Sequence, residues 1–256
     1  MLSRSLVVLA AAASGTLAAT PQGFEPAAET SLLVTYGPIV AMEGSVLAQA
    51  ATQIAPSIGT QSQLDGTSFA VLMIDLDIPT ANPPETNTLL HWMQTGLTQD
   101  TAATTINTTM DAMNAFLFQT SDVAAFAAYI GPAPPARIPL SHRYTQILVD
   151  TSAATEDELD VLKTAAANRS GFNALSVLTE AGLADKVLAG NFFNVTNAGP
   201  ASNSTTNNAG GSGSSSGTGS VSSPTQTAVF PGAAVSQRAS ELFVGMAMIG
   251  AVFLAL

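Results

Sequence analysis

The chain contains no cysteine and few basic residues. Its 256 residues include 7 Lys and Arg against 18 Asp and Glu, which gives a formal net charge of −11. The absence of Cys excludes disulfide bonds, thiolate catalysis and zinc or iron–sulfur sites with Cys ligands. The shortage of Lys and Arg argues against nucleic acid as a partner, because basic side chains supply most of the affinity for a phosphate backbone.

The N-terminus also has few charged residues and contains an apolar run. Residues 1–19 carry one basic residue, Arg4, ahead of an apolar run at residues 6–13 and a set of small residues. This order is typical of a secretory signal peptide, and the run is too short to span a bilayer. We expect cleavage after Ala18 or Ala19. The alternative is a buried N-terminal helix.

The C-terminus carries a second apolar run. Residues 232–256 begin with small residues at Gly232, continue through a short polar spacer and end in an apolar tail from Leu242. This arrangement is typical of a GPI-attachment signal. We expect the tail to be replaced by a GPI anchor at Gly232, which would hold a secreted protein at the plasma membrane or cell wall. The alternative is a retained tail anchor, which a phosphatidylinositol-specific phospholipase would not release.

Residues 196–231 consist mainly of Asn, Ser, Thr and Gly. A segment with so few apolar side chains cannot offset its chain entropy, so we expect a disordered stalk. This leaves residues 20–195 as one domain, which is long enough to bury a core. In an exported chain the pattern Asn-X-Ser/Thr marks candidate glycosylation sites. These sites are Asn107, Asn168, Asn194 and Asn203.

The domain begins with strand signals and ends with helix signals. Runs of apolar and β-branched residues bounded by turn residues predict the strands, and the run at 68–75 is typical of a strand buried on both faces. Thr155 followed by acidic residues predicts a helix start, and Gly182 predicts a helix end. The pattern favours a mainly β or α+β fold with a sandwich-like core and a few peripheral helices. The predicted strands are residues 31–36, 68–75, 89–95 and 143–150, and the second helix is residues 172–181.

The chain has only two histidines, and each lies in a dense motif. The first motif reads DLDIP at residues 75–79 and LHW at residues 90–92. The second reads YIGPAPP at residues 129–135 and SHRY at residues 141–144, and a third segment, AGNFF at residues 189–193, closes the domain. Two imidazoles, an aspartate, a tyrosine hydroxyl and backbone donors beside a Gly-Pro turn could surround one small polar group.

The two aspartates follow a buried strand, and we expect one to point into a cavity and the other outward. Pro79 ends ladder pairing in this interpretation, so that a pocket can open there. Each residue also has a plainer interpretation. A lone buried histidine is more often structural, an aspartate at a strand end is usually a turn residue, and Trp92 is a core residue. The plainer interpretations weaken because both histidines accompany the same kind of motif.

In this order and spacing, the motifs resemble those of the phosphatidylethanolamine-binding protein family (PEBP, or Raf-kinase-inhibitor-protein family), in a secreted fungal-type form. The resemblance covers about Leu32 to Val195 and rests on the signatures D-P-D-A-P…H-W and G-P-x-P-P…H-R-Y. It implies an antiparallel β-sandwich of the PEBP type with a small pocket for phosphate-like anions and phospholipid headgroups. By motif position, the pocket would be lined by Asp75, Asp77, Pro79, His91, Gly131, Pro132, His142 and Tyr144.

The chain departs from the family pattern near the expected pocket. Leu76 and Ile78 replace the usual Pro and Ala, and Thr80-Ala81 replaces the usual Ser-Arg, which removes a cation beside the pocket. Many animal members carry a C-terminal helix at the pocket mouth. We do not expect that helix here, because the stalk follows soon after Phe193.

The expected function is non-enzymatic binding of a small phosphorylated anion or a phospholipid headgroup, with no metal, cofactor or catalytic residue. Phosphoethanolamine suits the acidic chain, because its ammonium could pair with Asp75, which otherwise must orient His91. The alternative is inhibition of a serine protease or carboxypeptidase, as the resemblance implies for some relatives, or another protein-binding role. An enzyme ranks third, because residues 20–195 contain no G-x-S-x-G motif and Ser141 would point away from its neighbour His142.

Overall fold

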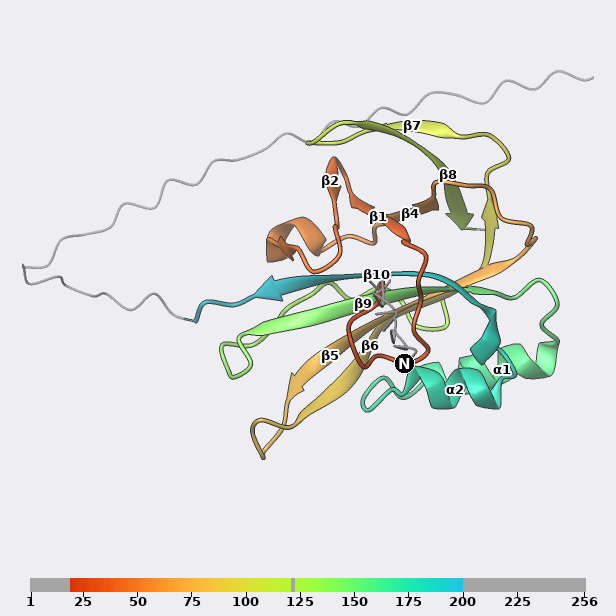
Figure 1. The fold of residues 1–256 in the computed structure, drawn as a ribbon. Coiled ribbons are helices and arrows are strands. Elements are labelled where there is room, and N and C mark those ends of the chain that lie inside the picture. The colour runs from red at the N-terminus through yellow and green to blue at the C-terminus, as the bar shows by residue number, and fades with distance from the viewer. Residues whose placement is uncertain (1–18, 121–122, 200–256) are drawn as a thin grey trace, which may run out of the picture. The chain divides into compact units, whose positions relative to one another are not determined.

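The computed structural model describes residues 19–120 and 123–199 (Figure 1). Ala19, the last residue of the predicted signal peptide, is buried, and its N–H donates to the Ala28 carbonyl over 2.8 Å. The rest of the predicted signal peptide, the stalk from residue 200, Asn203 and the GPI signal with Gly232 lie outside the described residues. The predictions made for them therefore stay predictions.

The described residues form a ten-stranded sheet with the order β2-β1-β4-β8-β6-β5-β9-β10-β3, and β7 pairs with β8 beside this path. Neighbouring strands are antiparallel, apart from the parallel pair β3 and β10. The strands are β1 (Leu33–Tyr36), β2 (Ile39–Val40), β3 (Val46–Leu47), β4 (Ser57–Thr60), β5 (Phe69–Pro79), β6 (Thr86–Gln99), β7 (Thr104–Asn107), β8 (Ala112–Thr120), β9 (Ser141–Asp150) and β10 (Val187–Thr196).

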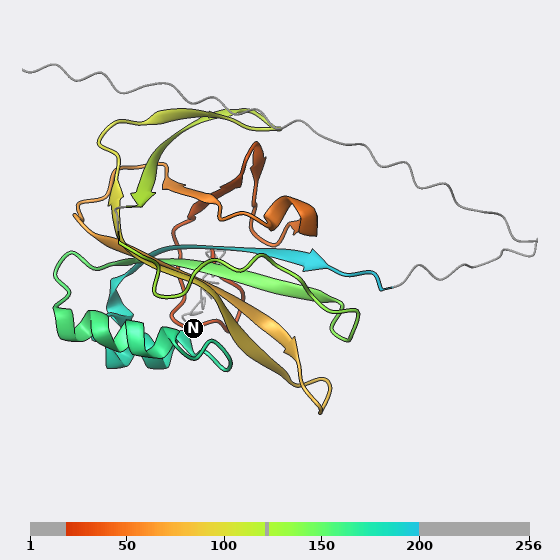
Figure 2. The same ribbon diagram turned by 180° about the vertical axis from the view of Figure 1, so that it is seen from behind.

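The sheet curls over itself, so that β1, β2 and β4 lie above β5, β6, β9 and β10 in Figure 1. Two helices, α1 (Glu156–Ala166) and α2 (Ala174–Glu180), cover the other face of these central strands, as the view from behind also shows (Figure 2). Short 3-10 turns lie at η1 (Gln49–Thr52) and η2 (Ala184–Lys186). The predicted mainly β fold with peripheral helices is therefore confirmed.

Strand β5 separates two apolar clusters. Val71 and Met73 belong to the cluster between the two layers of the sheet, together with side chains such as Phe193. Leu72 and Ile74 belong to the cluster beneath the helices. This alternation follows from the period of two in a strand, and it explains why the run reads as continuously apolar. The prediction that residues 68–75 are buried on both faces is confirmed.

Helix α1 begins where the sequence predicts, and α2 is slightly shorter than the predicted residues 172–181. The Thr155 hydroxyl accepts from the Glu158 N–H, and the Glu158 carboxylate accepts from the Thr155 N–H, which completes a capping box. Leu162 of α1 and Leu178 of α2 are fully buried against the sheet. After α2 the chain turns at Gly182, whose φ of +68° favours glycine. No helix in the described part of the chain is long and apolar enough to cross a membrane.

Candidate functional site

Three neighbouring strands bring Asp75, His142 and His91 together. Asp75 lies on β5 opposite Tyr144 of β9, and His142 and His91 come from β9 and β6. The Asp75 Oδ2 lies 2.8 Å from the His142 Nδ1 and 3.9 Å from the His91 Nε2. All three side chains are at most 4% exposed, so the carboxylate and both imidazoles form one buried cluster.

The loop that follows Tyr129 holds His91 from its other side. The His91 Nδ1 lies 2.7 Å from the Ile130 carbonyl, and the Ile130 N–H donates back to the His91 carbonyl over 2.9 Å. A carbonyl can only accept, so the proton of a neutral His91 lies on Nδ1. The Arg169 guanidinium supports the same backbone by donating to the His91 and Ala128 carbonyls over 3.1 and 2.8 Å.

Tyr144 packs against both imidazoles. Its ring meets that of His91 edge to face at 5.1 Å and lies at 24° to that of His142, 6.4 Å away. Burial, and then the charge of Asp75, raise the pKa of Tyr144 well above its ordinary value. The phenol therefore keeps its proton at neutral pH and can donate a hydrogen bond.

Three polar atoms of this cluster are buried without a hydrogen-bond partner among the described residues. They are the His91 Nε2, the His142 Nε2 and the Tyr144 hydroxyl. Leaving such atoms unpaired costs about 1–3 kcal/mol each. Their convergence from β6 and β9 is the arrangement expected of a small polar ligand site.

In the ligand-free protein, the surroundings of His91 favour the neutral form of its ring. Burial lowers the pKa of His91, although the Ile130 hydrogen bond and the charge of Asp75 oppose the shift. The neutral His91 presents a lone pair at Nε2, since its proton is on Nδ1. An anion at that position therefore requires a proton to bind with it.

The structure does not join Asp77 to this cluster. The Asp77 carboxylate accepts from the Arg143 Nη2 and Nε over 2.7 and 2.8 Å, and from the Arg143 backbone N–H over 2.8 Å. Burial alone would raise the pKa of Asp77, but the hydrogen bonds from Arg143 outweigh it and hold the pKa below its ordinary value. The two carboxylates therefore have different partners: Asp75 contacts the imidazoles, whereas Asp77 pairs with Arg143.

A local irregularity in β5 explains this divergence. A regular strand turns residues two apart to the same face. The register with β6 shifts between Asp75 and Ile78, and the Asp77 N–H donates to the Asp75 Oδ1 over 2.8 Å. The strand then continues to Pro79, which still pairs with Thr86. This pair is the last one between β5 and β6, so the prediction that ladder pairing ends at Pro79 is confirmed, although an irregularity interrupts the ladder before that residue.

Gly131 and Pro132 follow Ile130 and contact Gln53, a residue that the sequence did not indicate. A Cβ on Gly131 would lie 2.8 Å from the Gln53 Oε1 and 2.9 Å from the Gln53 Cα, so only glycine fits. The Gln53 Nε2 donates to the Pro132 carbonyl over 2.9 Å. The absence of a side chain at Gly131 thus allows Gln53 to hold the loop whose Ile130 carbonyl contacts His91.

The predicted glycosylation sites differ in their surroundings. Asn107 on β7 and Asn168 after α1 are exposed. Asn194 on β10 is half-buried, and its Nδ2 donates to the Gly44 carbonyl over 2.8 Å. That nitrogen is the atom a glycan would occupy, so the folded chain favours Asn107 and Asn168 over Asn194.

No group of three or more His, Cys, Asp or Glu residues within 19–120 and 123–199 is arranged to hold a metal ion. Both oxygens of Asp75 already accept hydrogen bonds, from His142 and from the Asp77 N–H. The cluster therefore offers a ligand its two Nε2 atoms and the phenol rather than a carboxylate.

Comparisons with known proteins find one similar sequence and several solved structures with partial similarity. A protein of Talaromyces stipitatus named phomoidride biosynthesis cluster protein N is 29% identical over 211 residues, which are 75% of this chain and 98% of the relative. A carboxypeptidase Y inhibitor, solved in complex with its cognate proteinase, is 19% identical, with a TM-score of 0.44 over 64% of this chain and 82% of the inhibitor. A phosphatidylethanolamine-binding protein of Plasmodium falciparum is 18% identical, with a TM-score of 0.44 over 68% of this chain and 88% of that protein.

The family model for phosphatidylethanolamine-binding proteins matches residues 36–193. That range contains each strand and loop that contributes to the buried cluster of Asp75, His91, His142 and Tyr144. The chain belongs to the phosphatidylethanolamine-binding protein family.

Proposed function

We propose that the domain binds a small phosphorylated anion, such as the phosphate of a phospholipid headgroup, at His91, His142 and Tyr144. The observation that carries this proposal is the convergence of three buried, unpartnered polar atoms: the two Nε2 atoms and the phenol. The family description, phosphatidylethanolamine-binding protein, supports a ligand of this class.

The site can supply hydrogen-bond donors to a phosphate if the histidine Nε2 atoms take up protons when the anion binds. The Tyr144 phenol is a donor at neutral pH because its pKa is raised. The His91 Nε2 becomes a donor when it takes up a proton, and the His142 ring is held by Asp75 so that its Nε2 is directed away from the carboxylate. Imidazolium and phenol donors form short, charge-assisted hydrogen bonds with phosphate oxygens.

Asp75 acts as a positioning residue in this proposal. Its Oδ2 accepts from the His142 Nδ1, which fixes the ring orientation, and its Oδ1 accepts from the Asp77 N–H. The sequence favoured His91 as the ring that Asp75 orients, but the nearer partner is His142, at 2.8 Å against 3.9 Å. Because both carboxylate oxygens are engaged, we expect the site to select the phosphate group and to gain little from the ethanolamine ammonium.

Calorimetric titration tests this function. We expect inorganic phosphate, methyl phosphate and O-phosphorylethanolamine to bind with affinities within about tenfold of each other, and Tyr144→Phe to weaken each by about tenfold through the loss of one hydrogen bond. Tyr129→Phe is the matched control, because the Tyr129 hydroxyl bonds to the Thr52 carbonyl and lies outside the cluster. Equal binding by the wild type and Tyr144→Phe would contradict the proposal.

We also propose that the protein acts outside the cell, at a membrane or wall, where the predicted signal peptide and GPI anchor would place it. The support comes from the sequence signals at residues 1–19 and 232–256. Inhibition of a serine carboxypeptidase stays the alternative function. An assay of such an enzyme with the purified chain distinguishes the two, since phosphate binding does not require a protease partner.

A further inference from the structure

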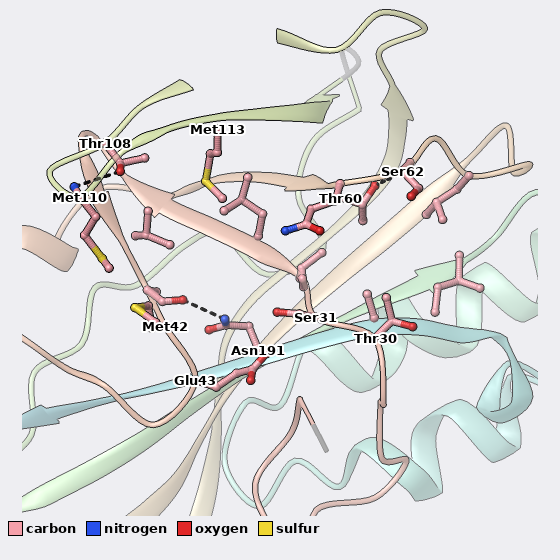
Figure 3. Close-up of a pocket in the computed structure, with 18 of the residues that line it drawn as sticks. Thr30, Ser31, Met42, Glu43, Thr60, Ser62, Thr108, Met110, Met113 and Asn191 are labelled. Atoms are coloured by element: carbon pink, nitrogen blue, oxygen red, sulfur yellow. Dashed lines mark hydrogen bonds between the residues drawn. The ribbon is translucent and has the colours of Figure 1, made fainter. Parts of the chain in front are cut away.

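A cavity lies between the two layers of the sheet, and its lining includes none of the residues of the imidazole cluster (Asp75, His91, His142 and Tyr144). It has a volume of about 540 Å³ and is lined by β1, β2, the turn between β7 and β8, and β10 (Figure 3). On β10 the cavity reaches Asn191, which pairs with Gln146, whereas His142 pairs with Val195. Four residues of strand separate these positions by about 13 Å, so the cavity is distinct from the imidazole cluster.

The walls of this cavity are largely apolar and adaptable. Its base includes Leu32 and Ala189, which are fully buried, and its mouth carries Met42 and Met110, which are 50% and 70% exposed. Met113 of β8 points toward the cavity in Figure 3. Methionine side chains adjust to the shape of an apolar partner, and a volume of this size suits a small molecule.

One buried polar atom on the wall lacks a partner. Asn191 is 2% exposed, and its Nδ2 donates to the Ala41 carbonyl over 2.9 Å. This contact fixes the amide orientation, because a carbonyl can only accept. The Asn191 Oδ1 is left buried with no hydrogen-bond partner among the described residues. A ligand with an N–H or O–H group would satisfy this acceptor.

The charges around the cavity select against anions. Glu43 and Asp111 are among the lining residues, whereas the lining contains no Lys, Arg or His. Two carboxylates without a basic partner in the lining repel a negatively charged ligand. This is the opposite of the preference proposed for the imidazole cluster, which binds an anion.

We propose that this cavity binds an uncharged, largely apolar small molecule that carries one N–H or O–H donor. The apolar body of the ligand would contact the methionine and leucine side chains, and its donor would pair with the Asn191 Oδ1. The proposal is independent of phosphate binding, because the two sites share no residue.

N-Phenyl-1-naphthylamine tests this proposal directly, since it is uncharged, has one N–H group and fluoresces more strongly in apolar surroundings. We expect saturable binding to the purified full chain in detergent-free buffer. Its sulfonated analogue, 8-anilinonaphthalene-1-sulfonate, differs mainly in its negative charge and should bind about tenfold more weakly or worse. Saturating O-phosphorylethanolamine should leave binding of the uncharged probe unchanged.

Variants locate the probe. Met113→Lys places a charge in the cavity and should weaken binding of N-phenyl-1-naphthylamine by about tenfold or more. Leu175→Lys is the matched control, because Leu175 is an exposed aliphatic residue on α2, away from the cavity. If circular dichroism shows that Met113→Lys does not fold, Met110→Lys, at the exposed mouth, replaces it. Absence of saturable binding, equal binding of the sulfonate, displacement by O-phosphorylethanolamine, or full binding by the folded lysine variants would each overturn the proposal.

Discussion

At the scale of single residues, the structure separates groups that the motifs had placed together. Asp75, His91, His142 and Tyr144 form one buried cluster, whereas Asp77 pairs with Arg143. The cluster could be predicted because each member belongs to a dense motif. The pairing of Asp77 with Arg143 could not be predicted, because it depends on a shift in strand register that the residue types do not indicate.

Contacts made by the backbone were also beyond prediction from the sequence. His91 is held by the Ile130 carbonyl, and Gln53 is locked to the Pro132 carbonyl across 79 positions of sequence. Any residue supplies a carbonyl, so the identity of Ile130 carries no signal. The close approach of Gln53 does leave one sign, which is the glycine at position 131.

Gly131→Ala tests this close approach. The added Cβ would overlap the Gln53 backbone, so we expect a loss of about 1–3 kcal/mol in the free energy of unfolding. Phosphate affinity should fall as well, because the displaced loop carries the Ile130 carbonyl that holds His91. Urea unfolding and calorimetric titration measure the two effects. Ala136→Ser, an exposed position in the same loop, is the control, and an unchanged Gly131→Ala protein would contradict the packing argument.

At the scale of elements, β5 and β9 were predictable from their apolar patterns, whereas β7 and β10 were not. The predicted segments 68–75 and 143–150 lie within or nearly match β5 and β9. Strand β7 reads TTIN and is mostly exposed, so its pairing with β8 supplies the structure that its composition does not indicate. β10 was noted as the motif AGNFF but not as a strand, because its glycine and asparagine residues weaken a strand pattern.

The start of α1 was predicted from its N-cap residue, Thr155, and a single substitution there tests the prediction. Thr155→Ala removes the hydroxyl that accepts from the Glu158 N–H, and we expect a loss of about 1 kcal/mol in the free energy of unfolding. Thr164→Ala is the matched control, because Thr164 is exposed within the same helix and alanine is the stronger helix former. Urea unfolding at neutral pH compares the two. Equal stability of both variants would contradict the role of the cap.

At the scale of the whole molecule, the chain is acidic, but the donors proposed to hold phosphate lie together in one buried cluster. The formal charge of −11 is spread over many side chains and is screened over about 10 Å at moderate salt. A buried cluster of imidazoles and a phenol therefore acts at shorter range than the overall repulsion. The predicted export signals and anchor belong to the same scale, and they depend on segments that the described residues do not include.

We expect the buried His91 ring to make the folded protein less stable in acid. The pKa of His91 is lowered in the folded protein, so the unfolded chain binds its proton more readily. The contribution of His91 is present above the ordinary histidine pKa of about 6.5 and is lost as the pH falls through the lowered folded value. Urea midpoints measured from pH 8 to pH 5 should decline less in His91→Gln than in the wild type. Parallel declines in the two proteins would contradict this assignment.

The most direct measurement of the central claim uses the fact that the chain has only two histidines. Long-range nitrogen–proton NMR reports each ring nitrogen separately. When inorganic phosphate is added at pH 7, we expect the Nε2 signals of His91 and His142 to move toward the protonated, hydrogen-bonded form, while both Nδ1 atoms keep their bonds to Ile130 and Asp75. Signals that stay unchanged at saturating phosphate would show that the imidazoles do not hold the anion.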